Sequence, residues 1–67
     1  MTKENSFIIQ GDVWSTSNTK LVNSSEDAKT REITRITLSN QDVPKTYYCD
    51  TDEQKKEARN IYNLLAP

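Results

Sequence analysis

Few residues of this chain could carry out covalent chemistry. The chain has no histidine and a single cysteine, Cys49, so it can form neither a Ser-His-Asp nor a Cys-His pair. Cys49 directly precedes a predicted helix, whose N-terminus would lower a thiol pKa, but Asp50 and Asp52 act in the opposite direction. We therefore favour a buried structural cysteine over a reactive thiol. We expect no catalytic residue and no enzyme activity.

Three carboxylates lie close together at Asp50, Asp52 and Glu53. A calcium loop needs more oxygen ligands than this and a glycine at its sharp turn. Capping of the helix that follows explains the same residues better. The only glycine of the chain is Gly11, so a glycine-rich loop that binds phosphate is absent as well. We expect no metal and no cofactor.

The strongest candidate site is a set of aromatic, arginine and aliphatic residues. Alternation along the predicted strands places these residues on one open face of a sheet. Aromatic and arginine side chains around aliphatic ones are typical of the energetic centres of protein interfaces. They are also typical of surfaces that stack and neutralise single-stranded nucleic acid. The candidate partner-binding residues are Trp14, Arg31, Ile33, Arg35 and Tyr48, with Ile8 beside them.

The charge balance favours a protein partner for this face. Nine basic and ten acidic residues give a net charge of −1, whereas domains that bind nucleic acid are usually basic. The partner would be a host protein or a second copy of the chain in a homodimer, and single-stranded nucleic acid is the alternative. The non-functional interpretation is that segment 15–29 covers the face, or that a bulge at Gly11 turns Trp14 into the core.

A second candidate surface consists of Lys55, Lys56 and Arg59 on the predicted helix. Asp52 lies three and four residues before the two lysines and partly neutralises them. A solvated helix face explains this stripe as well as a contact surface does. The exposed edges of a small open sheet are a third possible recognition surface.

The elements that must position these residues begin with a helix over residues 51–65. Asp50, Thr51 and Asp52 are all good N-cap residues, and either Asp50 with Glu53 or Thr51 with Gln54 has the spacing of a capping box. An apolar stripe recurs at intervals of three and four residues, as in a helix packed on one face. The stripe comprises Ala58, Ile61, Tyr62 and Leu65.

The rest of the chain is predicted to supply strands. Residues 6–14, 31–39 and 45–49 are rich in β-branched and aromatic residues, and 19–23 is a possible fourth strand. Residues 1–5 are expected to fray, 15–29 to form a hairpin arm or an ordered loop, and 41–44 to form a turn. In the third predicted strand, we expect Tyr47 and Cys49 to point inward and Tyr48 outward. The predicted fold is α+β: a small antiparallel β-meander with one C-terminal helix packed on one face.

The length of 67 residues fits a single small domain over residues 1–67. No window is long or apolar enough to cross a membrane and no signal-peptide core is visible, so we expect a cytoplasmic protein and no membrane partner. These features together predict a non-catalytic protein-binding module. We expect a small accessory or inhibitor protein, of the phage or mobile-element type, that docks on a larger protein. The alternative is a single-stranded nucleic-acid-binding protein.

Overall fold

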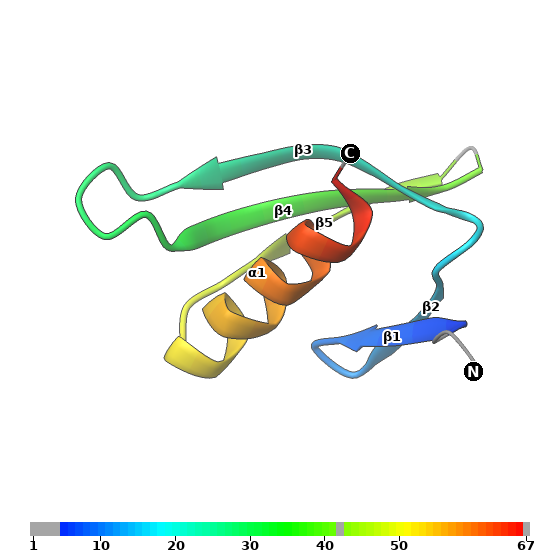
Figure 1. The fold of residues 1–67 in the computed structure, drawn as a ribbon, viewed down its shortest axis with the longest axis horizontal. Coiled ribbons are helices and arrows are strands. Elements are labelled where there is room, and N and C mark those ends of the chain that lie inside the picture. Colours follow the sequence, from blue (N-terminus) through cyan, green and yellow to red (C-terminus); the bar gives the residue numbers. More distant parts are fainter. Residues whose placement is uncertain (1–4, 42, 67) are drawn as a thin grey trace.

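The computed structural model describes residues 5–41 and 43–66. Within these ranges five strands and one helix form an α+β fold, which confirms the predicted class. The three later strands form an antiparallel meander, the first two form a separate hairpin, and the helix lies between them and packs on the meander (Figure 1). The elements are β1 (Ser6–Ile9), β2 (Asp12–Ser15), β3 (Thr19–Glu26), β4 (Ile33–Asn40), β5 (Val43–Tyr48) and α1 (Asp52–Leu65).

The prediction of one strand over residues 6–14 is wrong, because the chain reverses in its middle. Gln10 and Gly11 both have positive φ, 49° and 88°, the combination that a tight two-residue hairpin turn requires. Antiparallel pairing then places Phe7 opposite Trp14. The only glycine therefore marks a turn and not a bulge, and its freedom at positive φ is what the turn uses.

The possible strand 19–23 is confirmed and extends to Glu26, as β3. It pairs in the plane of the sheet with β4, so segment 15–29 extends the sheet and does not cover its open face. β5 begins at Val43, two residues earlier than predicted, and includes Pro44. Asp42 of the predicted turn lies outside the described residues, as do residues 1–4 of the predicted frayed terminus.

The helix is confirmed, with Thr51 as its N-cap. The Thr51 side chain accepts a hydrogen bond from the Gln54 backbone N–H at 3.1 Å, and the Gln54 side chain accepts one from the Thr51 N–H at 3.1 Å. Of the two predicted capping boxes the chain uses this one, which satisfies two backbone donors at once. Ala58 and Ile61 of the predicted stripe are buried against the sheet.

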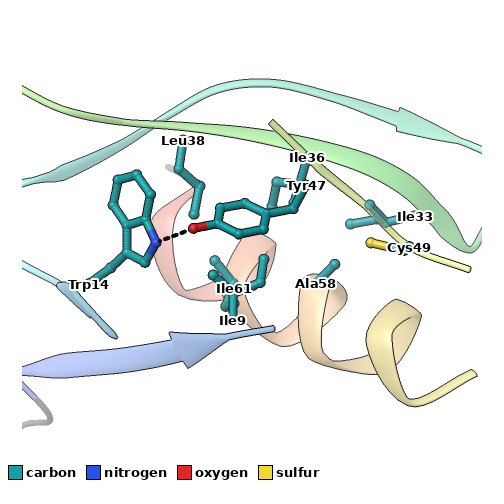
Figure 2. Packing of buried hydrophobic residues seen from close by; sticks show 9 residues of the cluster. All are labelled: Ile9, Trp14, Ile33, Ile36, Leu38, Tyr47, Cys49, Ala58 and Ile61. Carbon is teal, nitrogen blue, oxygen red and sulfur yellow. Dashed lines mark hydrogen bonds between the residues drawn. The ribbon is translucent and has the colours of Figure 1, made fainter. Parts of the chain in front are cut away.

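The core lies between the meander, the helix and the hairpin, and all three contribute to it (Figure 2). Tyr47 and Cys49 point inward and Tyr48 is 63% exposed, as the alternation predicts. Because the hairpin supplies core side chains of its own, it is part of the folded unit and not an appendage. The buried hydrophobic residues that form the core are Ile9, Trp14, Ile33, Ile36, Leu38, Tyr47, Cys49, Ala58 and Ile61.

Candidate functional site

Two residues of the predicted open face are buried instead. Trp14 is 8% exposed and Ile33 is 0% exposed, so the expectation that they lie on an open surface is wrong. Trp14 is turned inward by the hairpin reversal. In β4, Ile33 pairs with Glu26 and Arg35 pairs with Ser25, which leaves Thr34 as an extra residue. This bulge breaks the alternation of faces and brings Ile33 to the same side as the core.

Arg35 and Tyr48 are the two predicted residues that the structure brings together. They lie directly opposite each other on β4 and β5, on the face of the meander away from the helix. Arg35 donates from Nη2 to the Ser25 hydroxyl at 2.8 Å, and the Thr37 and Thr46 hydroxyls are 2.9 Å apart on the same face. This open face is therefore polar, with one arginine and one exposed ring. Ile8 is exposed on the separate hairpin.

Arg31 is separated from this face and joins the second predicted surface. It lies in the loop before β4 with a φ of 65°, and its side chain is 78% exposed. Together with Lys55, Lys56 and Arg59 it lines a cleft of about 310 Å³. The two predicted sets of residues are therefore divided differently in the structure. Arg35 and Tyr48 lie on the open face of the sheet, whereas Arg31 lies with Lys55, Lys56 and Arg59 beside the helix.

A groove that the sequence did not indicate lies between the hairpin and the end of the meander. Its volume is about 360 Å³. The aliphatic side chains of Val13 on β2 and Val43 on β5 line it, and they are 69% and 68% exposed. The remaining lining residues are Asp12, Trp14, Asn40, Lys45 and Tyr47. We call this the hairpin groove.

A chain of hydrogen bonds lines one side of the hairpin groove. The Trp14 indole N–H donates to the Tyr47 hydroxyl at 2.9 Å (Figure 2), and that hydroxyl donates to Asp12 Oδ2 at 2.6 Å. Lys45 donates to the same carboxylate oxygen at 2.7 Å. The two rings meet edge to face, with centroids 6.1 Å apart. These bonds fasten the hairpin to the meander and hold both rings in fixed positions.

The pKa values of the groups in this hydrogen-bond chain are shifted by their neighbours. The lysine and then the tyrosine hydroxyl lower the pKa of Asp12 below its ordinary value. The pKa of Lys45 is raised, chiefly by its bond to Asp12. Burial, followed by the bond to Asp12, raises the pKa of Tyr47. Asp12 is therefore ionised and Tyr47 is protonated at neutral pH. The hydrogen-bond chain thus keeps the same protonation states around neutral pH.

The thiol of Cys49 and the carboxylates at the start of the helix are the other groups that the sequence singles out. Cys49 is 4% exposed, and burial, with the charges of Asp50 and Glu57, raises its thiol pKa. A raised pKa and no access make a poor nucleophile. Among residues 5–41 and 43–66, no group of three or more His, Cys, Asp or Glu residues is arranged to hold a metal ion.

The hairpin groove was missed because its walls are far apart in sequence. Asp12 and Lys45 are separated by 33 positions, and only the tertiary fold brings β2 beside β5. Alternation along β5 places Val43, Lys45 and Tyr47 on the helix-facing side, and the structure shows that only Tyr47 of the three is buried. The core therefore ends before the strand does, and the rest of that face is uncovered.

The fold and the groove define a small α+β domain with a short meander, a docked hairpin and one helix. Comparison with protein-family models, with curated proteins and with solved structures finds no match to this chain. In the part of the chain that the structure describes, the helix is too short and too polar to cross a membrane.

Proposed function

We propose that the chain is a non-catalytic protein-binding module whose hairpin groove receives an apolar side chain of a larger protein partner. The observation that carries this proposal is the pair of exposed valines, Val13 and Val43, beside the fixed rings of Trp14 and Tyr47. Aliphatic walls with a few placed polar groups are the usual lining of binding pockets. An accessory or inhibitor role would follow from such docking.

The groove supports this proposal better than the edges of the meander do. β3 and β5 are its two edge strands. β3 contains a bulge at Val22, because Leu21 pairs with Leu38 and Asn23 pairs with Thr37. β5 carries Pro44, which lacks a backbone donor. Bulges and prolines are the devices by which natural sheets prevent pairing at an edge. Recognition through side chains in the groove is therefore favoured over addition of a strand.

The experiment compares two conservative double variants in a quantitative pull-down. Val13→Thr/Val43→Thr places two hydroxyls in the groove with little change in shape or strand propensity. The control, Ile8→Thr/Val22→Thr, alters two aliphatic residues outside the groove that are also more than half exposed. We expect a partner that the wild type and the control both retain, and that the groove variant retains about tenfold less.

Equal retention by both variants, or no retained protein, would contradict the proposal. Sedimentation of the purified chain tests the homodimer as a special case. Self-association that is lost only in the groove variant would identify the partner as a second copy.

A second candidate, single-stranded nucleic acid, is favoured by one observation, the exposed Tyr48 directly opposite Arg35. A ring for base stacking beside a cation for phosphate is the usual combination. The burial of Trp14 leaves this face with one ring where the sequence suggested two. Binding of a single-stranded oligonucleotide should weaken steeply with salt and disappear in Arg35→Ala/Tyr48→Ala. Binding that is unchanged in this variant would exclude the face.

A further inference from the structure

The cleft between the β3–β4 loop and the helix has a different chemistry from the hairpin groove. Its volume is about 310 Å³, at the lower end of the range for small-ligand pockets. The lining comes from two elements: the residues just before β4 and one face of α1. These residues are Arg31, Glu32, Lys55, Lys56, Arg59 and Asn60. We call it the cationic cleft.

The cationic cleft carries a local excess of positive charge. Glu26 accepts from Arg59 at 2.8 Å with one carboxylate oxygen and from Arg31 at 3.3 Å with the other. Lys55 lies 3.5 Å from Glu32. The four cations that line the cleft and the two carboxylates paired with them leave two positive charges, although the whole chain carries −1. Asp27, whose pKa is lowered by backbone hydrogen bonds and also by the charge of Lys55, offsets some of this local excess. Hydrogen bonds from Arg59 and then from Arg31 lower the pKa of Glu26. Glu26 is therefore ionised at neutral pH and remains paired with both arginines.

Donors remain available after these pairs have formed. A guanidinium has five N–H groups, and Arg31 uses only Nε for its bond to Glu26. Among the described residues, no acceptor bonds to the Nη groups of Arg31 or to the ammonium of Lys56. Both side chains are exposed at the mouth of the cleft. An incoming anion can therefore be bound without breaking an existing pair.

The cleft is also held in shape before any ligand binds. Arg59 Nη2 donates to the Arg31 carbonyl at 2.6 Å, which ties the loop to the helix. Within the loop, the Asp27 carboxylate accepts from the backbone N–H groups of Lys29 and Thr30 at 2.8 and 3.1 Å. The Arg31 N–H donates to the Asp27 carbonyl at 2.8 Å. A preformed site loses less conformational entropy on binding.

We propose that the cationic cleft binds a phosphate-type oligoanion of about the size of a diphosphate. Arginine matches the tetrahedral oxygens of phosphate with a planar fork, and lysine adds a mobile point charge. Phosphate carries more charge on each group than a carboxylate does, so the unpaired Nη groups of Arg31 and the ammonium of Lys56 attract it more strongly than they attract a carboxylate. This site is separate from the hairpin groove and does not depend on the function proposed there.

The test is a titration of the full chain with pyrophosphate at low ionic strength, in which binding is monitored through the chemical shifts of the backbone amides. Arg31→Gln/Lys56→Gln removes the two cations with available donors and leaves the Arg59–Glu26 pair intact. Lys56→Gln and Lys20→Gln form a matched pair, since both remove one exposed lysine but Lys20 lies on β3, outside the cleft. Far-UV circular dichroism checks that every variant is folded.

We expect saturable shifts confined to the cleft residues, binding about tenfold weaker in the double variant, and binding in Lys20→Gln unchanged from wild type. Shifts spread over all basic residues, or equal weakening by Lys20→Gln and Lys56→Gln, would overturn the proposal, and so would the absence of saturation. A parallel titration with ADP, which carries a diphosphate like pyrophosphate, distinguishes the source of the phosphate. Binding of ADP tighter than that of pyrophosphate would identify a nucleotide as the ligand, and equal or weaker binding would identify the phosphates alone.

Discussion

Replacing Tyr47 by phenylalanine tests whether the hydrogen-bond chain stabilises the fold. The variant keeps the ring, and with it the edge-to-face contact to Trp14, but removes the hydroxyl. The indole N–H, which donates only to that hydroxyl at 2.9 Å, is then left without its partner in the core. Asp12 also loses a donor. The perturbation is therefore polar, and the packing of the core is retained.

The expected loss follows from the buried indole donor. An unsatisfied buried donor destabilises a fold by roughly 1–3 kcal/mol, so we expect Tyr47→Phe to lower the free energy of unfolding by about 2 kcal/mol. For a domain of this size that corresponds to a fall in Tm of roughly 8–16 °C. Tyr48→Phe is the control, because that side chain is exposed. Its effect should stay within about 0.5 kcal/mol.

The assay is urea unfolding followed by the fluorescence of Trp14, the only tryptophan in the chain. In the folded wild type its emission should be blue and protected from iodide, because the ring is 8% exposed. If Tyr47→Phe were as stable as Tyr48→Phe, the hydrogen-bond chain would contribute nothing net to stability. A red, readily quenched emission from the folded wild type would refute the burial of Trp14 itself.

Three further outcomes follow from the turn, the helix cap and the lowered pKa of Asp12. Gly11→Ala should destabilise the fold by about 1 kcal/mol in thermal melts, because alanine resists a φ of 88°. Gly11→Asn should lose less stability, and equal losses in the two variants would contradict a turn at positive φ. Thr51→Ala should lower the free energy of unfolding by about 1 kcal/mol by removing the N-cap, whereas Thr51→Ser should retain stability; no difference between the two would mean that the capping box contributes nothing. Since the folded pKa of Asp12 lies below its ordinary 3.8, its contribution is present above that pH and is lost as the pH falls through the folded pKa. The fall in Tm from neutral to acidic pH should therefore be smaller in Asp12→Asn than in wild type, and an equal fall would exclude this linkage.

The sequence predicts the elements whose signals are local. The capping box at Thr51 and the stripe through Ala58 and Ile61 need only helical periodicity, and both are present in the structure. The inward placement of Tyr47 and Cys49 follows from strand alternation and the tendency of cysteine to be buried. The sequence left the order of the strands open, although short connections favour pairing between neighbours, and β3, β4 and β5 do pair in this way.

The candidate site could not be placed with the same success, because it depends on single-residue shifts. A turn at Gly11 and a bulge at Thr34 each reverse the face of the residues beyond them, and either feature is small within a run of good strand formers. Ile33 and Trp14 were misplaced for this reason. Arg35 and Tyr48 were placed correctly because their pairing lies beyond the bulge, in a regular part of the sheet.

The docking of the hairpin has a consequence for the order of folding. β3, β4, β5 and α1 are neighbours in sequence, so their contacts close short loops. The hairpin joins them through contacts that span 33 residues at Trp14–Tyr47 and 47 residues at Gln10–Glu57. Long-range contacts of this kind form late and open first.

Amides of β1 and β2 should therefore exchange with solvent through a partial opening that leaves the meander intact. The hairpin groove exists only while the hairpin is docked, since β2 forms one of its walls. A ligand bound in the groove must then slow exchange in the hairpin more than in β4. Exchange of the β1 amides can thus report occupancy of the groove, although β1 supplies none of the residues that line it.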